Sequence, residues 1–450
     1  MSYKQGALFV YTFGTVILLP CSINAATQPT TTMVSVSSQG YPGNSDSGLY
    51  QWSLGISGDG RYVAFVSAAS NLVANDTNSH HDIFVHDRQT GQTTRVSVNS
   101  SGAQSNGDSD FPAITPDGRY VTFQSAATNL IANDTNACND IFVHDRQTGQ
   151  TTRVSVSSSG AEGVGDSNYP SISADGRYVV FNSAATELDN TLLDFNNSHD
   201  IFLHDRQTGN TSLVSKAHSG NFPGNKPSYL AKISGDGHYV VFSSESTTLT
   251  GNSDTNDRED VFVRDIQAQT TSLVSATPSG SAGNHQSYSS AISHDGRYIA
   301  FDSEATDLVS NDTNNAYDIF VRDRNTNQTT RVSFDTNGNE RISHSRFPSL
   351  SADGRYISYY NLNPDNQYDT FFTDRQSRLT TMVSVNNSGA RGNLDSDNSA
   401  ISADGKYVVF ESYASNLVNN DITGYQDIFV RGPLQEFPWP MFLPAITGKK

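Results

Sequence analysis

An acidic pattern, Asp-x-Asn-x-x-x-Asp, recurs along the chain and offers the oxygen atoms that calcium prefers as ligands. Clear copies are NDTNSHHDIFVHDR from Asn75, NDTNACNDIFVHDR from Asn133 and NDTNNAYDIFVRDR from Asn311. Two carboxylates, an Asn carbonyl, backbone carbonyls and water can together suit one calcium ion. The candidate ligands are Asp76, Asn78, Asp82, Asp134, Asn136, Asp140, Asp194, Asn196, Asp200, Asp254, Asn256, Asp260, Asp312, Asn314, Asp318, Asp421 and Asp427.

The pattern is not an EF-hand loop, which needs a ligand at position five and a glycine at position six. Position five of the first copy is His80, and no copy has the glycine. Asp87 stands at position twelve, but at 3.3 Å per residue of strand it lies roughly 16 Å from Asp82. The other interpretation is structural, because Asp and Asn bond nearby backbone N–H groups and set turns before strands. Both interpretations stay open, and calcium is the one cofactor that the sequence suggests.

The acidic pattern is part of a longer repeat, which an Asp-Gly pair marks seven times. The pairs begin at Asp59, Asp117, Asp175, Asp236, Asp295, Asp353 and Asp404. Each copy predicts four strands, which in the second copy are residues 113–115, 119–125, 140–145 and 151–156. The central strands are apolar on both faces, so neighbouring sheets must cover them on both sides. Small sheets set radially in this way form a β-propeller.

The two ends of the repeat predict how the ring closes. A Thr-(Thr/Ser)-x-Val-Ser motif also occurs seven times, but it is displaced by one strand. Its first copy lies in residues 31–36, and the seventh repeat lacks a fourth strand of its own. We therefore expect an all-β, seven-bladed β-propeller of four-stranded blades over residues 31–431, closed when residues 31–36 pair with the last blade. An open solenoid of seven units is the alternative, but it gives no reason for the displaced strand.

Two copies of the repeat resemble the TolB-type β-propeller repeat, a relative of the WD repeat. They are SISADGRYVVFNSAATEL, residues 171–188, and AISHDGRYIAFDSEATDL, residues 291–308. The resemblance covers about residues 31–431 and is not to TolB itself, whose propeller follows an α/β domain. It implies a propeller that serves as a binding scaffold, often in the bacterial envelope, but a fold does not fix a function.

Charge and composition limit the remaining possibilities. The net charge of -18 argues against nucleic acid as a partner. Residues 1–25 read as a signal peptide, which predicts a secreted or periplasmic protein, and residues 432–450 form a Pro-rich C-terminal tail. After cleavage only Cys138 remains, and no segment of the mature chain is long and apolar enough to span a membrane. We expect a monomer.

The long loops of all copies should gather on one face of the propeller, and insertions on one face often mark the binding side. We expect this acidic loop face to bind a protein or glycan partner, with a possible dependence on calcium. The alternative is a propeller enzyme, a lyase or hydrolase, with a site over the central channel. No catalytic residue can be assigned from the sequence, and the enzyme is the less favoured reading. The least repetitive loops, where such a site would lie, are residues 188–198, 217–229 and 361–368.

Other repeated side chains are expected to be structural. His86, His144 and His204 take one position in successive copies and are expected at the surface. Pairs such as Asp87-Arg88 are expected in hairpin turns. The arginines after the Asp-Gly pairs, Arg61, Arg119, Arg177, Arg297 and Arg355, are expected to form turn or inter-blade contacts.

Overall fold

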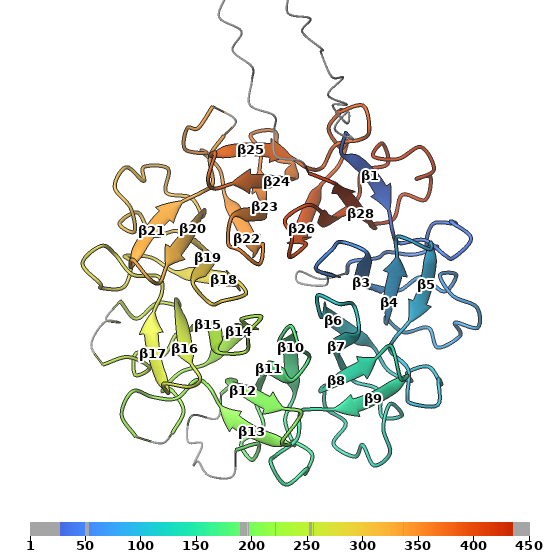
Figure 1. Ribbon diagram of the computed structural model, residues 1–450, viewed down its shortest axis with the longest axis horizontal. Helices are drawn as coiled ribbons and strands as arrows, with labels where there is room; N and C mark the ends of the chain where they lie inside the picture. Colours follow the sequence, from blue (N-terminus) through green and yellow to red (C-terminus); the bar gives the residue numbers. More distant parts are fainter. Residues whose placement is uncertain are drawn as a thin grey trace, which may run out of the picture.

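The computed structural model describes residues 28–49, 54–189, 196, 198–220, 222–251, 254, 256–335 and 337–434. Within these residues the strands form seven four-stranded antiparallel sheets. The sheets stand as blades around a central axis, in chain order around the ring (Figure 1). The predicted seven-bladed β-propeller is therefore confirmed. The expected signal peptide and most of the expected tail lie outside the described residues. No helix in the described part of the chain has the length and apolarity to cross a membrane.

Each blade has the same strand order from the channel outward. The innermost strands are β2 (Leu54–Ile56), β6 (Ser109–Ile114), β10 (Ser167–Ile172), β14 (Ser228–Ile233), β18 (Ser287–Ile292), β22 (Ser345–Leu350) and β26 (Ser396–Ile401). The second strands are β3 (Tyr62–Ser67), β7 (Tyr120–Ser125), β11 (Tyr178–Ser183), β15 (Tyr239–Ser244), β19 (Tyr298–Ser303), β23 (Tyr356–Leu362) and β27 (Val408–Ser412). The third strands are β4 (Asp82–Asp87), β8 (Asp140–Asp145), β12 (Asp200–Asp205), β16 (Asp260–Asp265), β20 (Asp318–Asp323), β24 (Tyr368–Asp374) and β28 (Asp427–Gly432). The outer strands are β5 (Gln92–Arg95), β9 (Gln150–Arg153), β13 (Asn210–Leu213), β17 (Thr270–Leu273), β21 (Gln328–Arg331), β25 (Leu379–Met382) and β1 (Thr30–Met33). We number the blades 1 to 7 from the innermost strands β2 to β26.

The ring closes through the N-terminal strand, as predicted. β1 is the outer strand of blade 7, with Thr30 opposite Gly432 and Met33 opposite Phe429 of β28. The strand is shorter than the expected residues 31–36. Beyond Met33 the Val34 N–H still bonds β28, but the chain then turns back and residue 36 bridges residue 42 instead.

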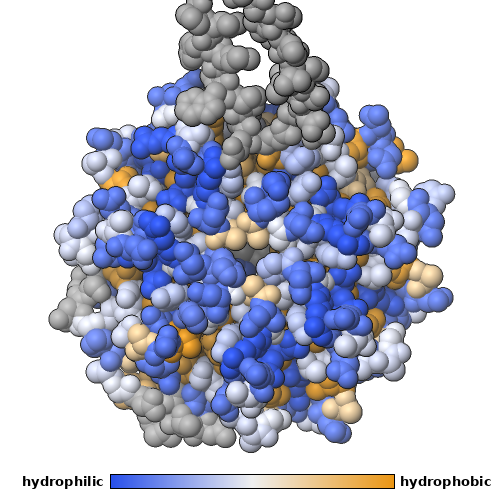
Figure 2. Space-filling view, viewed as in Figure 1, coloured by the Kyte–Doolittle hydropathy of each residue, from blue (hydrophilic) through white to orange (hydrophobic). Residues whose placement is uncertain are grey.

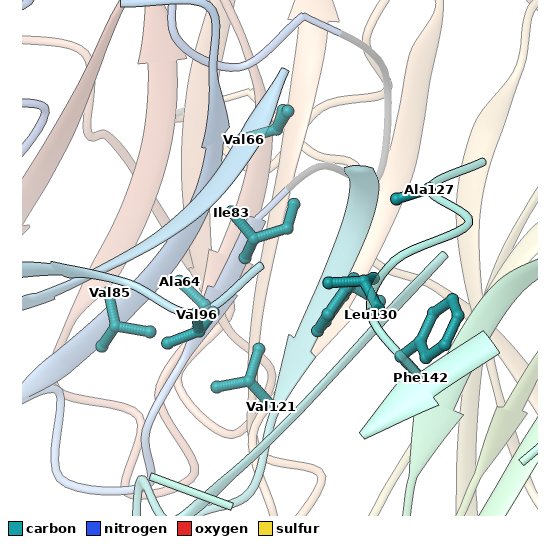
Figure 3. Packing of buried hydrophobic residues seen from close by; sticks show 10 residues of the cluster. Ala64, Val66, Ile83, Val85, Val96, Val121, Ala127, Leu130 and Phe142 are labelled. Carbon is teal, nitrogen blue, oxygen red and sulfur yellow. The ribbon is translucent and has the colours of Figure 1, made fainter. Parts of the chain in front are cut away.

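The hydrophobic core is divided into layers between adjacent blades. Figure 3 shows one layer, where side chains of blade 1 meet side chains of blade 2. Its members include Ala64, Val66, Ile83, Val85, Val96, Val121, Ala127, Leu130 and Phe142. Because every sheet has a neighbour on each side, the third strand is buried on both faces, and this explains the continuous apolar run of the DIFV segments.

The Asp-Gly turns join each blade to the one before it. Gly118 has a φ of 72°, and a Cβ atom there would lie 2.2 Å from the Tyr62 ring of blade 1. The Arg146 guanidinium lies 4.3 Å from the centre of the same ring and donates to the Gly118 carbonyl. Arg119 instead forms a two-point ion pair with Asp145 inside blade 2, at 3.0 and 2.7 Å. Arg119, which follows the Asp-Gly pair, thus stabilises its own blade. Arg146, from the Asp-Arg pair, links two neighbouring blades.

The expectation that the repeated histidines lie at the surface is wrong. His86, His144 and His204 are buried. In each, the Nδ1 atom is within hydrogen-bond distance of a threonine hydroxyl on the outer strand, 2.9 Å for His86 and Thr93. The threonine supplies the polar partner that a buried imidazole needs, and burial lowers the pKa of His86 and His204 to about 4.

Candidate functional site

The asparagine of the acidic pattern ties the loop to its surroundings. The Asn78 amide donates to the Asp82 carboxylate (2.9 Å) and to the Ser105 carbonyl (3.1 Å), and the Asn78 side-chain oxygen accepts from the His80 N–H. Asn136, Asn196, Asn256 and Asn314 make the same bond to Asp140, Asp200, Asp260 and Asp318. Since Ser105 belongs to the connection between blades, this bond brings two loops together on one face, which we call the loop face.

The second aspartate of the pattern anchors the outer strand in every blade. The Ser97 hydroxyl donates to Asp82, and it accepts from the Ile83 N–H at 3.1 Å. The serine is the last residue of the Thr-Thr-x-Val-Ser motif. The same serine–aspartate bond joins Ser35 to Asp427, Ser155 to Asp140, Ser215 to Asp200, Ser275 to Asp260, Ser333 to Asp318 and Ser384 to Asp369. These bonds explain why both motifs recur together.

In blades 1, 2 and 5 an arginine lies beside the two carboxylates that are candidate calcium ligands. Arg95, the last residue of β5, places Nη1 3.0 Å from Asp76 and 3.1 Å from Asp82. Arg153 of β9 and Arg331 of β21 take the same place in blades 2 and 5. Each of these arginines offsets one unit of the negative charge that the neighbouring carboxylates carry.

The most acidic of these groups holds three carboxylates. Oxygen atoms of Asp134, Asp140 and Glu162 lie within 4.8 Å of one another, a spacing that suits a metal ion. Arg153 stands among them, 2.9 Å from Asp140, 2.8 Å from Glu162 and 3.6 Å from Asp134. Burial, together with the charge of Asp140, raises the pKa of Asp134 to about 6. Asp312, Asp318 and Glu340 surround Arg331 in the same way.

Blade 4 lacks this arginine, because Leu273 stands at the equivalent end of β17. Asp254 is 6% exposed, and neither of its oxygens accepts a well-formed hydrogen bond from the described residues, although the Asn256 N–H favours its charged form. Burial raises the pKa of Asp254 to about 6 and that of Asp260 to about 7. Two buried carboxylates therefore share this place without a direct ion pair among the described residues, although the charge of Lys226 acts on Asp254 from a distance.

Blade 7 repeats this situation. Met33 takes the place of the arginine at the end of β1. Asp421 is buried, and its Oδ1 atom has no partner within the described chain. Burial raises the pKa of Asp427 to about 7. Asp194 of blade 3 lies outside the described residues, so the pattern is incomplete there.

A second group of side chains on the loop face breaks the repeat. The residue before the recurring third-strand aspartate of one blade is paired by position with the second residue of the next innermost strand. We call the set the loop-face ring: His81 with Asp110, Asn139 with Asn168, His199 with Tyr229, Glu259 with Tyr288, Tyr317 with Arg346, and Tyr368 with Asp397. The contacts differ from blade to blade: an ion pair between His81 and Asp110 (3.4 Å), a hydrogen bond between the two asparagines (3.3 Å), and ring packing of His199 on Tyr229 (5.8 Å between centroids).

Aromatic and charged groups of the loop-face ring concentrate at blades 5 and 6. The Arg346 guanidinium lies 4.2 Å from the centre of the Tyr317 ring and 4.9 Å from that of Phe347. Its Nε atom is 3.1 Å from the buried Asp302 carboxylate. Tyr368 packs edge-on against another tyrosine, with 5.2 Å between the ring centres. A rigid cluster with apolar faces and polar edges results.

Glu259 is the carboxyl group of the loop-face ring whose pKa is raised most. Burial, together with the charges of Glu245 and Asp302, raises the pKa of Glu259 to about 8. Burial and Asp395 raise the pKa of Asp397 to about 6. A carboxyl group that is protonated at neutral pH can donate a proton, which is the property of a general acid.

The sequence analysis predicted only a few positions of the loop-face ring. Tyr229 and Tyr368 end two of the three loops that were expected to break the symmetry, and part of the third, residues 188–198, lies outside the described residues. The arginines at the outer-strand ends and the rest of the loop-face ring were missed. Comparing the seven copies position by position would have found both, because the residue type at these positions differs between copies while the adjacent positions keep the same residue.

The fold and these groups define the class of protein as a seven-bladed β-propeller. The sequence matches no family model and no curated protein. Similar solved structures include TolB from Acinetobacter baumannii, with 16% identity, a TM-score of 0.42, and coverage of 71% of this chain and 63% of that one. A putative TolB from Agrobacterium tumefaciens shows 14% identity, a TM-score of 0.44 and coverage of 78% and 97%. A prolyl endopeptidase structure shows 12% identity, a TM-score of 0.50 and coverage of 87% and 51%.

This likeness is one of fold. The match spans less than two thirds of the Acinetobacter protein and about half of the endopeptidase. The seven observed blades confirm the predicted seven-bladed β-propeller fold.

Proposed function

We propose that the protein is a secreted or periplasmic scaffold that binds a protein or glycan partner on its loop face. The observation that supports this most strongly is the loop-face ring. In a fold built from seven similar units, a contact that every unit needs is often made by the same residues in each, as the serine–aspartate bonds are. The ring positions are structurally equivalent, yet they hold unlike side chains.

The chemistry of the ring suits a binding surface. Tyrosine offers a broad apolar face with a polar tip, and tyrosine and arginine are enriched where proteins bind their partners. Tyr288, Arg346 and Tyr368 are partly exposed. The carboxylates beside them favour a partner with hydroxyl groups or positive charge. Secretion is proposed from residues 1–25 of the sequence.

We extend the proposal to calcium at two places only, the pairs Asp254 with Asp260 and Asp421 with Asp427. In blades 1, 2 and 5 an arginine already supplies the positive charge, whereas these two pairs are buried without one in the described chain. Calcium takes carboxylate and carbonyl oxygens. Bound calcium would stiffen the loops of blades 4 and 7 that frame the binding face.

Binding is tested by photo-crosslinking the mature protein to envelope extracts and by probing a glycan array. Arg346→Ala and Tyr288→Ala should each weaken the captured interaction at least tenfold. The matched control is Arg378→Ala, an exposed arginine in a turn at the opposite end of blade 6. Equal binding by all three variants would remove the loop-face ring from the proposal, and loss with the control alone would place the site on the other face.

An acid–base enzyme is the second candidate, and Glu259 is the observation that favours it. A glutamate with a pKa of about 8 can donate a proton at neutral pH. If polysaccharides are turned over on this face, Glu259→Gln should abolish turnover and leave binding of the same polysaccharide intact. Binding without turnover by the unmodified protein would restrict the function to that of a scaffold.

A further inference from the structure

The innermost strands enclose a cavity of about 300 Å³ on the propeller axis. Viewed along this axis, the surface is hollowed at the centre of the ring (Figure 2). A cavity of this volume holds several water molecules, because one water needs only about 10–15 Å³ of such space. It has room for one sugar ring or for the last residue of a peptide.

Lys232 is the one charged side chain among the described residues that line this cavity. It lies on β14, opposite Val241 in the strand ladder. The equivalent ladder positions of the other blades all carry small uncharged residues: Gly55, Ala113, Ser171, Ala291, Ser349 and Ala400. A lysine at this place is therefore particular to blade 4 and is not needed to build a blade.

The ammonium group of Lys232 has no acidic partner in the described part of the protein. Two other lysines are paired: Lys226 is 2.5 Å from Asp257, and Lys406 is 3.2 Å from Asp404. Burial alone lowers the pKa of Lys232 to about 8. In a chain with a net charge of -18, carboxylates are plentiful, yet none of the described ones reaches this cation.

Two serines also belong to the lining of this cavity, and their hydroxyls lack partners in the described residues. Ser289 and Ser290, on the neighbouring strand β18, are 4% and 5% exposed. Neither hydroxyl makes a hydrogen bond within the described residues. Buried hydroxyl groups are normally hydrogen-bonded, so these two donors point to a ligand or to water in the channel.

We infer that the channel is a binding site for a carboxylate group, with the Lys232 ammonium as its counter-ion and the Ser289 and Ser290 hydroxyls as hydrogen-bond donors. A charge-assisted hydrogen bond to a carboxylate would restore the charged form of the lysine that burial disfavours. One cation matches the single charge of a carboxylate, whereas a phosphate would bury a second, unbalanced charge. The ligand is a uronic acid or a peptide C-terminus that enters the channel.

The site is independent of the loop-face ring, and its test needs no knowledge of the natural partner. The few lysines of the chain allow ¹³C-dimethyl labelling, so each ammonium gives a separate NMR signal. The probes are sodium glucuronate and N-acetylglycine, each against glucose and sodium chloride at the same ionic strength. Glucuronate binding alone would indicate a uronic acid, and N-acetylglycine binding alone a peptide C-terminus.

We expect at least one carboxylate to shift the Lys232 signal with a saturable dependence and to raise the pKa of Lys232, while Lys226 and Lys406 stay unchanged. Lys232→Ala places in blade 4 the residue of three other blades and should abolish binding measured by calorimetry; Lys232→Met serves if that variant folds poorly. Ser289→Ala with Ser290→Ala should weaken binding at least tenfold. No shift beyond that of chloride, stronger binding of inorganic phosphate, or full binding by both Lys232 variants would overturn the assignment.

Discussion

Replacing Arg153 by leucine tests whether arginine, and not metal, balances the carboxylates of blade 2. Leucine is the residue that blades 3 and 4 carry at this position, so the backbone should accept it. The Arg153 side chain is 8% exposed, and its guanidinium contacts three carboxylates. Removing one partner of a buried ion pair costs about 3–5 kcal/mol, because the remaining charge stays buried.

Proton uptake limits this cost. Asp134 already has a pKa of about 6 beside Arg153, and it should rise further without the cation. We therefore expect Arg153→Leu to lower the free energy of unfolding by about 3 kcal/mol at pH 7.5 and by clearly less at pH 5, where the carboxyls can protonate. Urea unfolding, with the same slope for both proteins, measures the difference. Arg258→Leu, which removes an exposed arginine from the same face, should change it by less than about 0.5 kcal/mol.

The same variant should acquire a response to calcium. Asp134, Asp140 and Glu162 remain within 4.8 Å of one another and lose their cation. At a calcium concentration of 100 times the dissociation constant, binding would return about 2.7 kcal/mol. A loss below 1 kcal/mol at pH 7.5, or an equal loss at both pH values, would refute the reasoning that the arginine balances this group.

Three further predictions rest on the same structure. Leu273→Arg should supply blade 4 with the missing guanidinium, so thermal unfolding should shift upward and no longer respond to calcium at that blade; a downward shift would contradict this. Asp260 and Asp427 have a pKa of about 7 in the folded state against about 3.9 unfolded. Between these two pKa values the folded protein binds more protons than the unfolded chain, so the free energy of unfolding should fall as the pH rises from 5 to 8. The fall should be smaller in Asp260→Asn and in Asp427→Asn. Gly118→Ala should cost about 2–4 kcal/mol, because it combines a strained φ of 72° with a collision against the neighbouring tyrosine. Gly91→Ala, with a nearly equal φ of 73° but open space, should cost only about 1–2 kcal/mol, and equal losses in urea unfolding would exclude the collision.

The fold was predictable because local and global signals agree. The Asp-Gly turns fix the hairpins, and the displaced Thr-Thr-x-Val-Ser motif implies closure of the ring. The placement of His86 was not predictable in this way. In a strand covered on both faces, alternation no longer tells which side chains reach solvent, and the hydroxyl that lets the imidazole be buried lies on another strand.

The candidate sites were predictable only as a pattern of residue types. The sequence shows that Asp76 and Asp82 recur, but it does not show that Arg95 reaches both, since that contact depends on how the outer strand ends beside the loop. It also cannot show that Asp254 is left without a direct ion pair when Leu273 replaces the arginine. Lys232 stands out in the sequence only after the ladder register has aligned it with six small residues.

The closure of blade 7 also orders the events of folding. β1 is the first strand to emerge, whether from the ribosome or after export across a membrane, but its partner β28 follows about 400 residues later, as the bond between Thr30 and Gly432 shows. Until then β1 has an exposed edge that can pair with the wrong strand or with another chain. Six blades can each form from neighbouring segments as they emerge, whereas the seventh requires the largest loop closure in the molecule. We therefore expect closure to be the slowest assembly step, and the stage at which a chaperone that shields strand edges would have its greatest effect.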